Sequence, residues 1–216
     1  MKGNIGKIWE KFVYLEPNNE MNNGICIIGE IMGDPTFNHS TKGENFFKTR
    51  LCVKRESGRN DCIPVIAKYE CMRGVLAGDR VKITGRISSF MHHAEGEKKN
   101  WLDLYVYAET IEKIQDTEMP SEQNQVNEVY LRGYICQPVR MTCNKKKKIT
   151  EVFLSVYRGK DKVDFIPTFA WEKLANVASE FHYGQEVCLK GKIRSRRYLS
   201  KGEYRERIEV YIYEMI

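Results

Sequence analysis

The stretch "DFIPTFAWEKLANVASEFHYGQEVCLKGKI", residues 164–193, changes its hydrophobic period twice. Over residues 187–193 apolar side chains alternate with polar ones, the pattern of a strand with one buried face. Over residues 172–181 the apolar residues instead recur at helical intervals. The pattern therefore predicts a strand, a helix and a second strand in this order.

Residues on both sides of this stretch extend the β pattern. Alternating runs precede it at 127–139 and 152–156, and another run follows it at 208–212. Five short strands with one helix after the third are the order expected of an OB-fold barrel. A small β-sandwich is the alternative, although it would leave the helix without an obvious place to dock.

Four landmarks of this half also occur earlier in the chain, in the same order and at offsets of 104, 103, 106 and 106 residues. They pair residues 23–35 with 127–139, 61–67 with 164–170, 78–87 with 184–193, and 102–107 with 208–213. Because the order and spacing are kept, we interpret the chain as a tandem duplication. We expect an all-β protein with short helices, made of two tandem five-stranded Greek-key OB-fold barrels.

The predicted domain limits follow from this repeat. The first OB domain covers residues 22–114 and the second covers 127–216, while the polar segment 115–126 has the composition of a linker. Residues 1–21 contain an amphipathic stripe that predicts one helix. That helix either packs on its own domain or a sister subunit, or docks replication or recombination proteins.

Composition excludes several classes of protein. The chain is 42% hydrophobic and 30% charged, and no apolar run approaches the ~20 residues that cross a bilayer. Seven cysteines without a CxxC pair indicate reduced thiols, so we expect a soluble cytoplasmic protein without membrane contact. The sequence has no phosphate-binding loop, no HExxH and no GxSxG motif. We therefore predict no enzyme activity, no catalytic residues, no metal and no cofactor.

Positive charge is concentrated in the second half of the chain. Residues 22–115 carry 14 basic and 12 acidic side chains, whereas residues 127–216 carry 18 and 11. Strand alternation predicts one outward row of cations on the fourth strand, spaced roughly 6.6 Å apart. The row consists of Lys190, Lys192, Arg194 and Arg196.

Aromatic residues lie on or beside the strands that neighbour this row. They are Phe165, Phe169, Trp171, Tyr198 and Tyr204. Flat rings next to cations suit unpaired bases and phosphates together. The alternative is a solvated charged face with some of the rings in the core, Phe169 among them.

Residues 164–198 resemble the middle of the bacterial single-stranded DNA-binding protein family, and "NEVYLRGYICQPVR" (127–140) resembles its opening strand. The resemblance implies base stacking on Phe165, Trp171 and Tyr198. It also implies phosphate contacts from Lys173, Arg194, Arg196 and Arg197. Lys146 and Lys147, in the predicted loop between the first two strands, would extend the path of the nucleic-acid backbone.

The first copy departs from the family pattern. The residues that replace the stacking and phosphate-binding groups are Cys62, Lys68, Ser88, Phe90, Met91 and His92. We therefore expect this copy to bind weakly or to serve assembly. The family commonly assembles four OB domains, so the resemblance implies a homodimer. It also has a short acidic tail, which the strand-like end "VYIYEMI" does not match.

These observations predict a bacterial, phage or mobile-element protein that binds single-stranded DNA without catalysis and protects unpaired strands in replication, recombination or element transfer. Two alternatives stay open. A primosome-like adaptor would use its OB domains mainly to bind proteins. An RNA-binding OB protein would prefer ribose strands through 2′-hydroxyl contacts.

Overall fold

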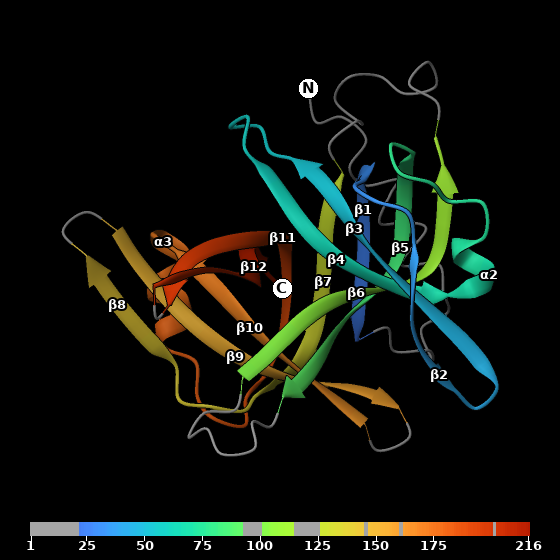
Figure 1. Cartoon of the computed structure of the whole chain (residues 1–216). Helices are drawn as coiled ribbons and strands as arrows, with labels where there is room; N and C mark the ends of the chain where they lie inside the picture. The colour runs from blue at the N-terminus through green and yellow to red at the C-terminus, as the bar shows by residue number, and fades with distance from the viewer. Residues whose placement is uncertain (1–21, 93–100, 115–125, 145–146, 160–161, 201) are drawn as a thin grey trace, which may run out of the picture.

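The computed structural model describes residues 22–92, 101–114, 126–144, 147–159, 162–200 and 202–216. In this part of the chain the structure is almost entirely β (Figure 1). No helix within the described residues is long and apolar enough to span a membrane. The predicted N-terminal helix and nearly all of the predicted linker lie outside the described residues.

Within the described residues, each half contains six strands and one short helix. In the first half the strands are β1 (Asn23–Ile31), β2 (Thr36–Thr41), β3 (Glu44–Lys54), β4 (Asn60–Lys68), β5 (Arg80–His92) and β6 (Trp101–Lys113), and helix α2 (Tyr69–Met72) follows β4. In the second half they are β7 (Asn127–Ile135), β8 (Arg140–Asn144), β9 (Lys147–Gly159), β10 (Lys162–Trp171), β11 (Glu186–Ser200) and β12 (Glu203–Met215), and helix α3 (Lys173–Ser179) follows β10.

Starting from the central neighbours β1 and β7, equivalent strands follow in the same order towards the two edges of the sheet. Neighbours run β2-β3-β4-β6-β5-β1-β7-β11-β12-β10-β9-β8, and additional pairings of β1 with β3 and of β7 with β9 close each half on itself. Each half is therefore an OB-fold barrel, and the predicted all-β tandem OB architecture is confirmed. Buried apolar residues of both halves form one continuous cluster.

The two barrels are joined through antiparallel pairing of their first strands, β1 and β7 (Figure 1). Ile25 lies opposite Val129, its equivalent in the repeat, and the pairing extends evenly on both sides of this position. Equivalent residues can face each other in this way only across an approximate two-fold axis. The duplicated chain is thus arranged like a symmetric dimer within one polypeptide.

A second set of equivalent contacts crosses the junction between the barrels. The buried Asp61 of β4 accepts a hydrogen bond from the backbone N–H of Ser195 on β11, with N and Oδ1 2.7 Å apart. Its counterpart Asp164 of β10 accepts one from the N–H of Ser89 on β5, at 2.8 Å. A buried carboxylate of each barrel therefore binds the long hairpin of the other barrel, β11–β12 for Asp61 and β5–β6 for Asp164.

The closure of each barrel depends on a glycine at the same place in both copies. A Cβ atom at Gly29 would lie 2.5 Å from the carbonyl oxygen of Cys52, and one at Gly133 would lie 2.6 Å from that of Ser155. Any side chain here would push β1 away from β3, or β7 away from β9. Close strand approach therefore requires a glycine at both positions.

The structure corrects two details of the repeat. The fourth landmark is shifted by two residues. Ile87 pairs with Val106, and its equivalent Ile193 pairs with Val210. The offset between the last strands of the two copies is therefore 104 residues and not 106. The described part of each copy also has six strands instead of five. The additional strands β2 and β8 form hairpins with β3 and β9, and β8 with β9 occupies the predicted lysine-rich loop.

The predicted helix at 172–181 is confirmed as α3, and it buries Ala175 and Ala178 against the barrel. Its equivalent α2 has only four residues. All seven cysteines are free thiols. Cys136, predicted to lie inside a strand, follows the last residue of β7.

Candidate nucleic-acid interface

Two stacked aromatic rings form the centre of the candidate interface. Trp171 ends β10 and Tyr211 lies on β12, the strand that pairs with β10 in parallel. Their ring centroids are 5.7 Å apart and the ring planes differ by 12°. The guanidinium of Arg194 lies 4.9 Å from the centre of the Tyr211 ring, and the ammonium of Lys147 lies 5.8 Å from that of Trp171. The site thus combines flat rings with cations at short range.

A cavity of about 620 Å³ lies over these rings. It is lined by Arg55, Arg59, Lys147, Trp171, Lys192, Arg194, Tyr211, Ile212 and Tyr213, and we call it the Trp171 cavity. Five of these nine side chains are Lys or Arg, and three are aromatic. Space of this size next to a ring stack can hold a flat organic group, while the cations can contact its anionic neighbours.

The polar atoms of the two rings differ in their hydrogen bonding. Burial, together with the Glu209 carboxylate, raises the pKa of the Tyr211 hydroxyl, which donates a hydrogen bond to Glu209 Oε2 at 3.0 Å. The indole Nε1 of Trp171 is buried and has no hydrogen-bond partner among the described residues. A buried donor of this kind can be satisfied by an acceptor on a ligand.

The predicted outward row of cations on β11 is present, but acidic residues accompany three of its four members. Lys190 Nζ lies 3.1 Å from Glu214 Oε1, Lys192 Nζ lies 3.6 Å from Glu56 Oε1, and Arg196 Nη1 lies 3.8 Å from Glu209 Oε1.

Glu56 is 85% exposed, so its ion pair with Lys192 contributes little stability and can be replaced at low cost by a phosphate. The exchangeable partner in this row is therefore that of Lys192.

The first barrel contributes cations to this site that the sequence analysis missed. Arg55 and Arg59 belong to the hairpin between β3 and β4, and both line the Trp171 cavity of the second barrel. Arg55 is held in place, because its Nε donates to Asp61 Oδ2 at 2.7 Å and its Nη2 donates to the carbonyl oxygen of Ser195 at 2.8 Å. The basic run "KRESGRN" was the available signal.

The end of the β11–β12 hairpin carries a separate group of predicted residues. Arg197 lies over the ring of Tyr204 at 4.7 Å, and Arg207 lies over that of Tyr198 at 5.9 Å. Tyr204 is 69% exposed. None of these residues lines the Trp171 cavity, so the structure separates them from the site's centre.

Phe165 lies on the same face of β10 as Trp171 but six residues earlier, which corresponds to roughly 20 Å along a strand. Its ring is 6.5 Å from that of Phe153, and its backbone N–H donates to Ser89 Oγ of the first barrel. Phe169, between them, is covered by Tyr211 and Arg207. Aromatic rings thus follow this face of β10 from the Trp171 cavity to the junction with the first barrel.

Three other predicted residues lie apart from the cavity. Lys173 is exposed at the start of α3, and Lys190 lies on β11 beyond the cavity lining. Lys146 is outside the described residues. The sequence analysis also missed Tyr211, although an aromatic residue at an outward strand position was the signal that could have found it.

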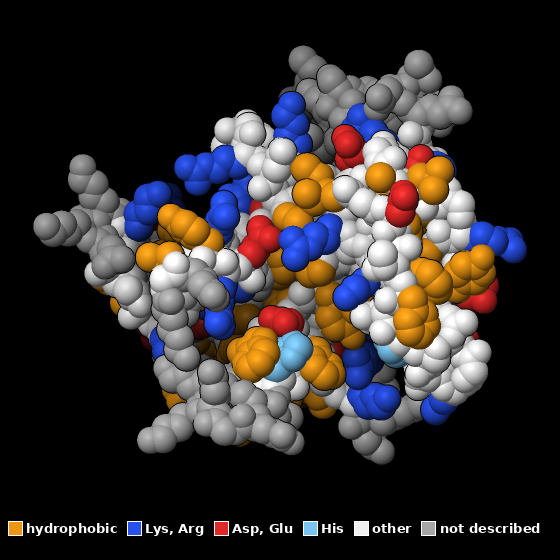
Figure 2. Space-filling model, in the orientation of Figure 1, with side chains coloured by type: hydrophobic (Ala, Val, Ile, Leu, Met, Phe, Trp, Pro, Cys, Tyr) orange, Lys and Arg blue, Asp and Glu red, His pale blue; other side chains and the backbone are white. Residues whose placement is uncertain are grey.

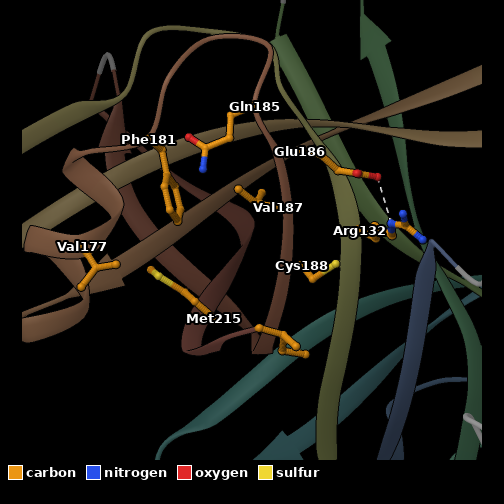
Figure 3. Close-up of a pocket in the computed structure, with 9 residues that line it drawn as sticks. Arg132, Val177, Phe181, Gln185, Glu186, Val187, Cys188 and Met215 are labelled. Atoms are coloured by element: carbon orange, nitrogen blue, oxygen red, sulfur yellow. Dashed lines mark hydrogen bonds and ion pairs between the residues drawn. The ribbon is translucent and has the colours of Figure 1, made fainter.

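A smaller cavity of about 310 Å³ lies between α3 and the end of β12 (Figure 3). Figure 3 shows Val177, Phe181, Val187 and Met215 around it, with the Arg132–Glu186 ion pair at one side. Arg132 Nε is 2.9 Å from Glu186 Oε1. The lining is mainly apolar and lacks stacked rings beside a row of cations, so the nucleic-acid interface is better placed at the Trp171 cavity.

Comparison with known proteins agrees with this fold. None of the curated protein sequences matches the chain. Among solved structures, the wild-type single-stranded DNA binding protein from Thermus aquaticus is similar, with a TM-score of 0.69 and 19% identity over 90% of this chain and 91% of that chain. A deletion mutant of the same protein has a TM-score of 0.67 and 19% identity, over 90% of this chain and 93% of that chain.

The sequence of the second barrel matches a protein family, whereas the similar structures show only the fold. Residues 126–216 match the model of the "Single-strand binding protein family". This segment contains β7 to β12 together with the Trp171–Tyr211 stack. The second barrel is thus similar in sequence to the single-strand binding protein family.

Proposed function

We propose that the protein binds single-stranded DNA on the outer face of its second barrel, with the Trp171 cavity as the central site. The observation that carries this proposal is the stack of Trp171 on Tyr211 with Arg194 and Lys147 beside it. The match of residues 126–216 to the model of the single-strand binding protein family supports it. The protein would act without catalysis, by sequestering and protecting unpaired strands in replication, recombination or mobile-element transfer.

Binding would proceed through two kinds of interaction. Lys192, Arg194 and the two arginines of the β3–β4 hairpin attract the phosphate backbone, and the release of counterions makes this contribution dependent on salt. Bases then stack on Trp171, at roughly 1–3 kcal/mol for each base. Duplex DNA keeps its bases paired and cannot offer their flat faces to these rings.

We also propose that two chains associate and bring four OB folds together. On β1 of the first copy, Cys26 and Ile28 are buried against Val126 and Ile114, so these two side chains are not available for this contact. Sedimentation equilibrium at micromolar concentration should give twice the chain mass, and a single-chain mass would contradict the dimer.

A fluorescence titration of the full chain tests the binding proposal, because Trp171 is one of three tryptophans. Oligo(dT), oligo(rU) of the same length and duplex DNA are added at low and at moderate salt. We expect strong quenching by oligo(dT) and little response to duplex DNA. Stronger binding of oligo(rU) would favour RNA as the ligand, while no binding of either strand would favour the adaptor.

A further inference from the structure

The apolar cavity between α3 and the end of β12, which we call the α3–β12 cavity, leaves hydrophobic side chains of the second barrel uncovered (Figure 3). Val177 is 52% exposed and Ile216 is 66% exposed, while Phe181 and Met215 are half-buried. Apolar side chains grouped around a hollow in this way are typical of a site that receives another apolar group.

The charge around this cavity differs from that around other exposed hydrophobic side chains. Figure 2 shows one face of the molecule, on which Lys and Arg side chains lie among the hydrophobic ones. A larger cleft of about 700 Å³ at Phe90 is likewise lined by Lys48 and Arg50. The α3–β12 cavity has one cation in its lining, Arg132, which is paired with Glu186. Its surface therefore suits an apolar protein segment.

The internal symmetry of the chain shows which segment approaches this surface. In the first barrel, the chain before β7 covers the outer face, because Val126 is buried with Cys26 and Ile28 and its carbonyl oxygen accepts a hydrogen bond from the N–H of Ile28 at 2.8 Å. In the second barrel, the carbonyl oxygen of Asn22 accepts the equivalent bond from the N–H of Arg132 at 2.7 Å. The chain that enters β1 thus meets the second barrel at the equivalent place.

Asn22 lies close to the α3–β12 cavity. Its partner Arg132 is directly opposite Cys188 of β11, and both of these residues line the cavity. Because neighbouring strands are about 4.8 Å apart, the backbones of Asn22 and Cys188 are separated by roughly 10 Å. Residues 14–21 can span up to about 26 Å when extended. A segment that ends at residue 13 can therefore reach the cavity of its own chain.

Residues 5–13 have the composition that this cavity requires. The sequence predicts an amphipathic helix there, with charged residues on the face opposite the apolar one. A helix of this length is marginal in water unless its apolar face packs on another surface. The apolar stripe consists of Ile5, Ile8, Trp9, Phe12 and Val13.

We propose that residues 5–13 dock in the α3–β12 cavity of their own chain, with the apolar stripe against Val177, Phe181 and Met215. This inference goes beyond the proposed DNA binding and does not depend on it. The α3–β12 cavity and the Trp171 cavity share no lining residue, so the docked segment leaves the proposed nucleic-acid interface open.

A disulfide trap in the full-length protein tests the docking, because Cys188 supplies a native thiol in the cavity. Phe12→Cys adds a thiol to the apolar stripe. Oxidised glutathione then takes up both thiol hydrogens, leaving a disulfide in the protein and two molecules of reduced glutathione. We expect a bond between position 12 and Cys188 within one chain, identified by peptide mass spectrometry and by the single-chain mass on a non-reducing gel.

Lys7→Cys is the matched control, because Lys7 lies on the opposite face of the predicted helix and should give no bond to Cys188. Equal yields from Phe12→Cys and Lys7→Cys would overturn the docking. A bond that joins two chains, at twice the chain mass, would also overturn it, because the segment would then occupy the cavity of a second copy.

A second measurement requires no new thiol. Iodoacetamide should alkylate Cys188 roughly tenfold faster in Phe12→Asp than in the wild-type protein, because a charge on the stripe prevents docking and uncovers the cavity. Lys7→Asp is the control and should leave the rate unchanged. An unchanged rate in Phe12→Asp would contradict the docking. Binding of oligo(dT), measured on the same variants, tests the proposed function separately.

Discussion

The two long hairpins, β5–β6 and β11–β12, have equivalent positions in the two barrels but end in different chemistry. The described part of the first hairpin ends at Phe90, His92 and Trp101, whereas the second has Arg196, Tyr198 and Arg205 at the equivalent positions. Where the hairpins join the barrels they are alike. The side chain of Asn23 makes two hydrogen bonds with the backbone of Ile87, and that of Asn127 makes the same two with Ile193. The duplication has kept the contacts that hold the barrels together, while the exposed ends have diverged.

The largest expected effect concerns the two buried aspartates at the junction. Asp61→Ala should lower the free energy of unfolding by about 3 kcal/mol, because it removes the partner of Arg55 and of the Ser195 N–H. Asp164→Ala should cost less. Its Oδ2 has no hydrogen-bond partner among the described residues, and Arg158 Nη1 is 3.3 Å from its Oδ1. Urea unfolding of both variants measures the difference, and equal costs would mean that the two halves of the junction are equivalent.

The next effect separates the two tryptophans. Trp171→Ala should weaken binding of an oligo(dT) of about 8 nucleotides by about 1–3 kcal/mol without changing the salt slope. Trp101→Ala should leave the affinity for this short strand unchanged. Fluorescence anisotropy with a labelled strand gives both values, and a comparable loss from Trp101→Ala would mean that the second barrel is not the main site.

A smaller effect tests whether the Trp171 cavity uses cations from both barrels. Arg59→Ala should lower the slope of log affinity against log salt by about 0.7, as expected for one phosphate contact on a single strand, although Arg59 belongs to the first barrel. Arg73→Ala is the control, since Arg73 is exposed and lies outside this cavity. An unchanged slope for Arg59→Ala would show that the β3–β4 hairpin does not contact the strand.

The smallest expected effect concerns Glu56, the carboxylate that is paired with Lys192. Glu56→Gln should strengthen binding about twofold at low salt, because Lys192 loses its exposed partner and becomes fully available to phosphate. The gain should disappear at high salt through screening. Weaker binding of this variant in the same anisotropy titration would indicate that Glu56 orients Lys192 and does not compete for it.

The sequence predicts the two barrels well because the alternation of apolar and polar residues, and its repetition in the two copies, reflect which side chains form the core. The same alternation predicts the outward position of Arg194, whereas the resemblance to the single-stranded DNA-binding protein family is what assigns Trp171 to the site. The error in the fourth landmark has a physical cause. A shift of two residues leaves every side chain of a strand on the same face, so the hydrophobic pattern cannot detect it.

Other features depend on information that one sequence does not contain. Strand β2 is exposed along nearly its whole length, so its residues show no apolar alternation. Arg55 and Arg59 reach the second barrel only because β1 pairs with β7 and places one barrel's hairpin on the other's face. The stacking of His92 on Trp101 depends on the register of β5 against β6, which the sequence pattern does not contain.

Photocrosslinking of the wild-type protein to a short strand tests the location of the main interface most directly. The strand is an oligo(dT) of about 8 nucleotides that carries one 5-iododeoxyuridine, and the labelled residues are identified by mass spectrometry. The structure predicts labelling at Trp171 or Tyr211, the stacked rings of the Trp171 cavity. Labelling confined to the apolar cavity at Phe181, or to the first barrel, would contradict it.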